Sequence, residues 1–327
     1  MHEIPGWFEA TSLTVFGVLL LADLWFVARR PHVPSVRECT AWIGFYVGLA
    51  LVYGVALWAV AGSAPATEFY AGWLTEYSLS VDNLFVFVLV MASFAVPRDQ
   101  QQRVLMVGIV VALVLRGVFI TLGAAIIDHF TWVFYLFGAF LVYTAAQLVR
   151  GGGDDDEYRE NALVRVARRV LPMTDRYDGG HLVTTVDGRR LLTPLLLVFV
   201  AIGTTDLLFA FDSIPAIFGL TQDPYIVFMT NLLALMGLRQ LYFLLGGLLD
   251  RLVYLPVGLA VILAFIGVKL FLEALHENTV GFINGGQPVD VPEIATWVSL
   301  AVIVLVLAVT AAASLWKTSR DAARDAD

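Results

Sequence analysis

The sequence of 327 residues contains few charged residues and almost no cysteine. Only 15% of the residues are charged, whereas 59% are hydrophobic and the mean hydropathy is +0.80. This composition differs greatly from that of an ordinary soluble domain and predicts an all-α, polytopic membrane protein. The one cysteine, Cys39, excludes a disulfide within the chain and a cysteine metal cluster.

Histidine is absent from the predicted membrane core. All five histidines fall in predicted loops or at helix ends: His2, His32, His129, His181 and His276. A zinc or copper pathway is therefore disfavoured. The sequence contains no G-x-x-x-x-G-K-[ST] motif, so direct use of ATP by this chain is disfavoured as well. We expect no enzymatic activity, no bound cofactor and no nucleic-acid partner.

Apolar runs of about 20 residues, the length that crosses about 30 Å of hydrocarbon, predict about nine transmembrane helices. They are expected at residues 12–28, 41–62, 70–95, 103–126, 131–149, 193–219, 225–248, 254–275 and 294–316. The N-terminal stretch MHEIPGWFEATS lacks the basic region of a cleavable signal peptide, so the first helix is expected to be retained.

The basic residues predict how these helices are oriented. Of the 20 Lys and Arg residues, 17 fall in loops or tails on one side, eight of them in residues 150–192, and none falls in an opposite-side loop. Lys and Arg near helix ends stay in the cytoplasm. The N-terminus is therefore expected outside and the C-terminus inside.

The chain divides into five predicted segments. They are two N-terminal helices (1–69), a first three-helix repeat (70–149), a cytoplasmic loop (150–192), a second three-helix repeat (193–275), and a C-terminal helix with its tail (276–327). The loop contains a short basic helix, which either lies against anionic headgroups or belongs to a solvated connector. Its stretch HLVTTVDGRR predicts a small hairpin.

The two repeats are predicted from matching acidic and basic positions. The aligned pairs are Glu76 with Asp206, Asp82 with Asp212, and Arg116 with Arg239. Because each repeat has an odd number of helices, the second enters the membrane from the opposite side, which is the inverted-repeat plan of many transporters. In that plan the four acids meet near the midplane, where carboxylate oxygens suit Mn²⁺, Mg²⁺ or Ca²⁺.

The spacing within each acidic pair limits how one cation is bound. Six residues on a regular helix correspond to about 9 Å of rise, too far for both acids to bind one ion. Either each helix is broken between its acids or the cation bridges the repeats. The residues that would permit a break are Ser78, Ser80, Gly203, Thr204, Thr205 and Pro215. Our hypothesis is that Asp82 and Asp212 bind the ion directly, while Glu76 and Asp206 complete the shell or carry protons.

Other polar residues leave two interpretations open. The intramembrane bases Arg116, Arg239 and Lys269 either supply a counter-charge to the acids or form structural ion pairs. Asp23 either lines an accessory path or makes a polar contact, and Asn231 either faces the site or forms an interhelical hydrogen bond. The acids of the predicted outer loops either concentrate cations or form a solvated surface: Glu68, Asp223, Glu273, Glu277, Asp290 and Glu293.

The two motifs SLSVDNLFVFVLVMASFAVP and TTDLLFAFDSIPAIFGLTQDPYIVFMTNLLALMGLRQLYFLL resemble those of the TerC family of bacterial integral membrane proteins, over most of residues 41–275. The resemblance implies an inner-membrane protein linked to manganese export, to metal supply for exported enzymes and, by the family's name, to tellurium resistance. It implies that metal transport uses Glu76, Asp82, Asn83, Asp206, Asp212 and Ser213. Some relatives carry a further acid where this chain has Gly203, so a smaller ligand set is expected here.

These observations predict a membrane transporter that exports a divalent cation, foremost Mn²⁺, by alternating access. Because a bound dication displaces protons from its ligands, proton coupling is a further hypothesis. The expected partners are the cation and the lipid bilayer, and no protein partner is predicted. The alternative is a non-transporting membrane scaffold of a metal or tellurite stress-response complex.

Overall fold

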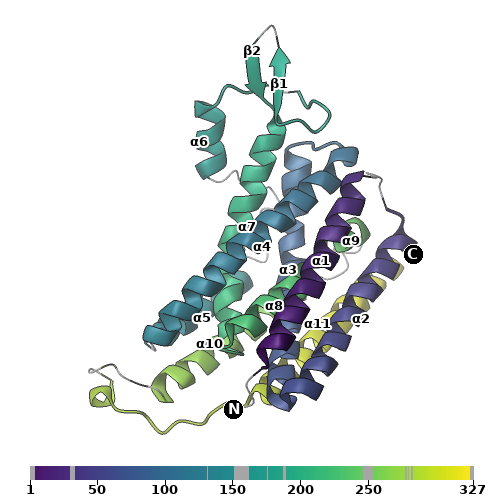
Figure 1. The fold of residues 1–327 in the computed structure, drawn as a ribbon. Helices are drawn as coiled ribbons and strands as arrows, with labels where there is room; N and C mark the ends of the chain where they lie inside the picture. Colours follow the sequence, from purple (N-terminus) through teal and green to yellow (C-terminus); the bar gives the residue numbers. More distant parts are fainter. Residues whose placement is uncertain are drawn as a thin grey trace.

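The computed structural model describes residues 4–29, 34–130, 132–150, 162–174, 176–186, 189–245, 253–276, 278, 280 and 283–324. The elements, in chain order, are α1 Gly6–Arg29, α2 Val36–Ala61, α3 Ser63–Ser93, α4 Arg98–His129, α5 Val133–Arg150, α6 Ala162–Val170, β1 Val183–Val186, β2 Arg189–Leu192, α7 Pro194–Phe218, α8 Pro224–Leu235, α9 Leu238–Leu245, α10 Leu255–His276, the 3-10 turn η2 Asn284–Gly286 and α11 Thr296–Arg324 (Figure 1). The predicted all-α architecture is confirmed.

Eight helical spans in the described part of the chain are long and apolar enough to cross a membrane. They cover every predicted segment except 70–95, which forms α3 but is not among the eight. Several helices begin a few residues before the predicted position, and at one of these early starts a polar side chain caps the first turn. At the start of α2, for example, the Ser35 side chain accepts a hydrogen bond from the Glu38 amide.

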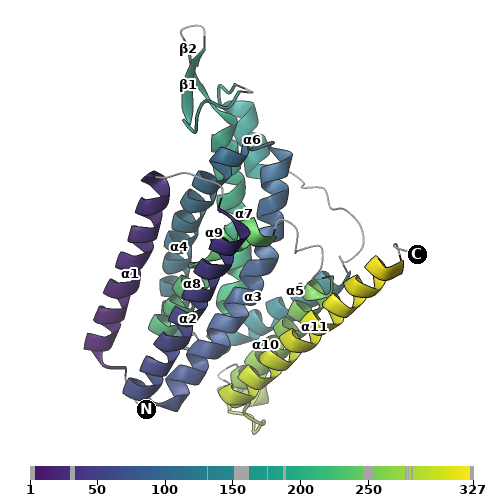
Figure 2. The same cartoon turned by 90° about the vertical axis from the view of Figure 1, so that its right-hand side faces the viewer.

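The helices form a bundle with α3 near its centre. α3 packs against α2, α7, α8 and α11, while α5 packs along α10 and α4 packs against α7 and α8. The β1–β2 hairpin projects from one end of the bundle, and the N-terminus lies at the opposite end (Figures 1 and 2). The contacts α3–α8 and α4–α7 are equivalent under the predicted alignment of the repeats. The inverted symmetry itself stays a prediction.

Both helices that carry the acidic motifs are continuous, so a break between the paired acids is the wrong alternative. α3 runs without interruption through Glu76 and α7 through Asp206. The hydroxyl of Ser78 donates to the Leu74 carbonyl at 2.7 Å, and that of Thr204 donates to the Val200 carbonyl at 2.6 Å. These side chains bond within their own helices, which accommodates them without unwinding.

The remaining proposed break residues also lie inside these helices. Ser80 is part of α3, and Gly203, Thr205 and Pro215 are part of α7. Pro215 lies in the last turn of α7, where its missing N–H removes one backbone hydrogen bond but does not end the helix before Phe218.

The interruption occurs instead in the helix that follows α7. The predicted segment 225–248 is divided into α8 and α9, because Met236 has an extended backbone and Gly237 has φ +93°. A positive φ of this size strains any residue that has a side chain, so glycine is suited to this position. The matching helix of the first repeat, α4, is continuous.

The short helix and the hairpin predicted within residues 150–192 are present as α6 and β1–β2, although Asp187 and Gly188 lie outside the described residues. The connector is docked on the bundle. Val164 of α6 is fully buried, and the Tyr177 hydroxyl donates to the Phe94 carbonyl at 2.7 Å. Burial raises the pKa of Tyr177 to about 12, so this hydroxyl remains a donor at neutral pH.

Two glycines lie where α5 and α10 pack closely against each other. A Cβ on Gly138 of α5 would lie 2.8 Å from the carbonyl oxygen of Gly267 of α10, and a Cβ on Gly267 would lie 2.9 Å from Val142. Small residues permit this backbone approach, which is a usual source of helix association in membranes.

We expect Gly138→Ala to lower the thermal unfolding midpoint of the detergent-purified protein. The added methyl group separates α5 from α10, at a cost on the order of 1–3 kcal/mol. Gly44→Ala is the matched control, because nothing lies within 4 Å of a Cβ at that helical glycine. An unfolding midpoint of Gly138→Ala equal to that of Gly44→Ala would contradict the packing argument.

Candidate metal centre

A buried arginine joins acids from both predicted repeats. Arg116 of α4 forms an ion pair with Glu76 of α3, and its Nη2 donates to Oδ1 of Asp206 of α7 at 3.3 Å. Its Nη1 also donates to Oδ1 of Asn231 of α8 at 2.9 Å. These four residues are at most 3% exposed. We call Glu76, Arg116, Asp206 and Asn231 the central cluster.

The charges of the central cluster do not balance. One guanidinium faces two carboxylates, which leaves a formal charge of −1 among these groups. A buried net charge is unfavourable unless another group of opposite sign compensates it. The central cluster is therefore suited to receive a cation.

Three polar atoms of the central cluster are buried without a hydrogen-bond partner among the described residues. They are Oε2 of Glu76, Oδ2 of Asp206 and Nε of Arg116. Further along α7, Oγ of Ser213 is also buried without a partner. Ser80 is close by, with its hydroxyl 3.5 Å from Oε1 of Glu76. Buried polar groups are normally paired, so each of the two carboxylates keeps one oxygen that could accept a further partner.

The structure describes only part of the predicted ligand set. Asp82 and Asn83 lie on α3 and Asp212 lies on α7, but their side chains are outside the described residues. Among the side chains that are described, no three His, Cys, Asp or Glu residues are arranged to hold a metal ion. The direct-ligand role of Asp82 and Asp212 stays a prediction.

Arg239 does not share the environment of Arg116. It lies on α9, and its Nη2 donates to Oδ1 of Asp23 of α1 at 3.0 Å. Because Gly237 turns the chain just before α9, Arg239 is displaced from the position that continuous α4 gives Arg116. Asp23 therefore makes a polar contact, and Arg239 is paired with an acid outside the repeats.

Lys269, the third intramembrane base, lies elsewhere again. It lines a cavity of about 450 Å³ with Glu68, Glu273 and Glu293. No hydrogen bond or ion pair joins it to the central cluster within the described residues. Among the three predicted counter-charges, the structure places Arg116 with Glu76 and Asp206.

Asn231 forms the interhelical hydrogen bond that was one of its two predicted uses. Its Nδ2 donates to the Val227 carbonyl of its own helix at 2.9 Å, which fixes its oxygen toward Arg116. The alignment of the repeats does not predict this contact, because it treats the two repeats as equivalent. A lone amide in an apolar helix was the available signal.

Comparison with known proteins places the chain in a family. The description of the matching family is "Integral membrane protein TerC family", and the match covers residues 61–322. No solved structure matches the chain significantly.

Several curated bacterial proteins are similar over most of this chain. An uncharacterized membrane protein of Mycobacterium tuberculosis (Rv2723) is 49% identical over 93% of this chain and 78% of its own length. One from Myxococcus xanthus (STKORF319) is 39% identical over 99% and 96%. The Escherichia coli K12 protein named "Putative membrane-bound redox modulator Alx" is 38% identical over 94% and 93%. The chain therefore belongs to the TerC family of integral membrane proteins.

Proposed function

We propose that this protein exports a divalent metal cation, foremost Mn²⁺, through the central cluster by alternating access. The observation that carries the proposal is that the Arg116 guanidinium holds two carboxylates, those of Glu76 and Asp206. Each carboxylate has one oxygen that is buried and has no partner among the described residues. Ionisable residues within membrane helices are functional by default. Their oxygen chemistry is that of a hard cation site.

The ion pairs of Arg116 would keep the two buried carboxylates stable when no cation is bound. Its guanidinium compensates Glu76 and Asp206 when no cargo is bound, since buried carboxylates without a counter-charge would be costly. A dication that enters the cluster competes with Arg116 for the same two carboxylates. Release of the guanidinium would then couple metal binding to movement of α4 against α3 and α7.

The helix packing supports an alternating-access mechanism. The central cluster joins α3, α4, α7 and α8, and these helices include one acid-bearing helix from each predicted repeat. In inverted-repeat transporters the cargo binds where the equivalent helices meet, and the halves then move as bodies around it. A cation held between Glu76 and Asp206 would bridge the repeats, which is the alternative compatible with unbroken α3 and α7.

A relative's name suggests redox chemistry, which the composition of this chain does not favour. The Escherichia coli relative is named a putative membrane-bound redox modulator. The sequence of this chain has a single cysteine, Cys39, and that residue is 1% exposed. Disulfide exchange requires two thiols and access to them. Metal export, in contrast, requires carboxylates within the membrane helices, and this chain has them.

The scaffold alternative rests on one observation, the projecting β1–β2 hairpin with its exposed residues Arg189 and Arg190 (Figure 1). A surface of this kind suits an acidic partner. The alternative does not account for the buried acids of the central cluster.

We expect Glu76→Gln and Asp206→Asn each to reduce the initial rate of Mn²⁺ flux into proteoliposomes by at least about tenfold, the effect of ~1.4 kcal/mol. Each change removes a charge that the cation requires while keeping the side-chain shape. Asp290→Asn is the control, because that carboxylate is exposed. Gel filtration of each variant establishes that it is folded. Flux at the wild-type rate in both folded variants would refute the site.

Replacing residues 183–190 by a short Gly-Ser linker separates transport from scaffolding. Since the hairpin projects from the bundle, we expect Mn²⁺ flux to stay within about twofold of wild type, as for a surface change. In cells, the same variant is expected to keep any metal-tolerance phenotype. Retained flux with a lost phenotype would favour the scaffold.

A further inference from the structure

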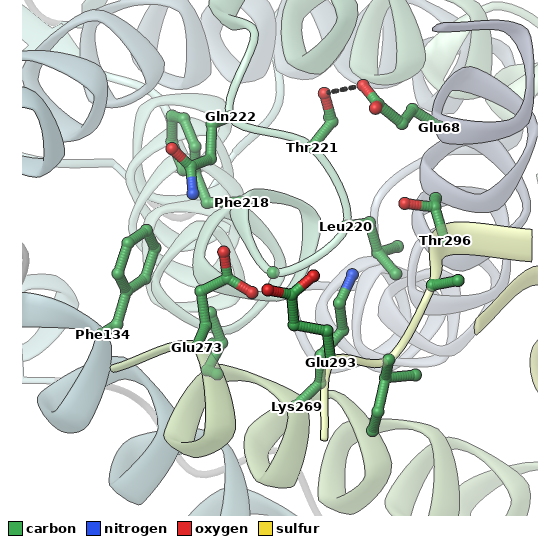
Figure 3. A pocket seen from close by; sticks show the side chains of 14 residues that line it. Glu68, Phe134, Phe218, Leu220, Thr221, Gln222, Lys269, Glu273, Glu293 and Thr296 are labelled. Carbon is green, nitrogen blue, oxygen red and sulfur yellow. Dashed lines mark hydrogen bonds between the residues drawn. The ribbon is translucent and has the colours of Figure 1, made fainter. Parts of the chain in front are cut away.

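A cavity of about 430 Å³ lies between the two N-terminal helices and the repeats. It is bounded by α1, the start of α2, the start of α4 and the start of α9. α1 itself lies at the edge of the bundle (Figure 2). The lining is mostly apolar, in contrast to the cavity beside Lys269, where several polar side chains project inward (Figure 3). We call it the α1 cavity.

The α1 cavity lies close to one end of the bundle, the end that carries the hairpin. α1 runs from the N-terminus toward that end (Figure 1). Asp23 in the lining is six residues before the end of α1, or about 9 Å of helix rise. Gln102 in the lining is followed by Arg103, which donates to the Gly180 carbonyl of the connector at 3.3 Å. Since this end is the predicted cytoplasmic one, the cavity is at the depth of the inner-leaflet headgroups.

An aromatic wall on α1 and α2 forms the apolar side of the α1 cavity. Trp42 contacts the Phe45 ring edge-on at a centroid distance of 5.6 Å and stacks on Tyr46 at 5.8 Å. Phe26, Trp42 and Phe45 line the cavity and are also exposed on the outside of the bundle. In a membrane-spanning bundle that outer surface faces lipid, so the cavity is accessible to acyl chains.

Arg239 is the polar group at the inner side of the α1 cavity. It is 7% exposed, and its Nη2 donates to Oδ1 of Asp23 at 3.0 Å. Nη2 also donates to the Gln240 amide oxygen at 2.7 Å when that amide is turned to face it. Nη1 is buried and has no hydrogen-bond partner among the described residues. A buried guanidinium donor normally has an acceptor, so the cavity suits a ligand that brings one.

The charges around the α1 cavity favour an anionic acceptor. Arg29 ends α1 and Arg37 lies in the first turn of α2, and both are exposed. With Arg239 they outnumber Asp23 and Glu38, which leaves a formal charge of +1 among these described groups. A phosphate matches the planar fork of donors that a guanidinium presents. The ligand therefore combines a phosphate with an apolar chain.

We propose that the α1 cavity binds one acidic phospholipid, with its phosphate on Arg239 and an acyl chain against the aromatic wall. Basic pockets between transmembrane helices on the cytoplasmic side are suited to acidic headgroups. A largely apolar cavity with a few polar groups is the usual form of a ligand site. The lipid would hold α1 against α9. This inference does not depend on whether the protein transports a cation.

The test is native mass spectrometry of the detergent-purified full chain during titration with phosphatidylglycerol. We expect one saturable site with a dissociation constant about tenfold or more below that for phosphatidylethanolamine of the same chains, whose ammonium cancels the phosphate charge. Glycerol 3-phosphate has the phosphate without the chains and should not displace the lipid at the same concentration. Equal affinity for the two lipids, or displacement by glycerol 3-phosphate, would contradict the proposal.

A charge-neutral double variant locates the phosphate. Asp23→Asn/Arg239→Gln keeps the net charge of the chain and replaces the ion pair with two amides. We expect its affinities for the two lipids to differ by no more than about threefold. Arg189→Gln/Arg190→Gln removes exposed charges from the hairpin and should keep the wild-type preference. A wild-type preference in the folded double variant Asp23→Asn/Arg239→Gln would show that Arg239 does not bind the phosphate.

A second variant locates the chain without changing any charge. Ala22 lines the α1 cavity, so Ala22→Leu extends a larger side chain into the space and should weaken phosphatidylglycerol binding by about tenfold. Ala10→Leu, at an exposed position of the same helix, is the matched control and should bind as wild type does. The inference is wrong if folded Ala22→Leu binds the lipid as tightly as Ala10→Leu.

Discussion

The buried contact of Arg116 with Glu76 and Asp206 is the interaction on which the arrangement of the bundle depends. A charge in the membrane core must be paired, and each of these side chains has its partner on another helix. The need to pair these charges fixes how α3, α4 and α7 face one another. The hydrogen bond from Arg116 to Asn231 also holds α8 against this group of helices. The side chains that hold these helices together are thus the same ones that form the proposed cation site.

The two halves of the bundle use their matching arginines differently, and the cause is local. Gly237 adopts φ +93° and ends α8, whereas α4 continues through the equivalent region. Arg239 consequently pairs with Asp23 of α1, and only Arg116 of the two arginines contacts Glu76 and Asp206. An asymmetric site of this kind carries less positive charge than a symmetric one, which favours cation binding.

Much of this organisation follows from sequence patterns that obey simple physical rules. Hydropathy predicts the long helices, and the repeat alignment predicts that Glu76 and Asp206 come together. The interruption at Gly237 is not predictable, because glycine inside an apolar run is common in continuous membrane helices. The sequence predicts that Ser78 and Thr204 permit a helix break, but their hydroxyls bond to the preceding turn of the same helix.

The central claim is that one cation is shared by carboxylates from both repeats, and a double-mutant cycle tests it most directly. Mn²⁺ affinity would be measured for Glu76→Gln, Asp206→Asn and the double variant in the same detergent. If both carboxylates bind one ion and one guanidinium, the two losses are strongly coupled, by about tenfold or more relative to their product. Losses that multiply independently would contradict a site shared between the repeats.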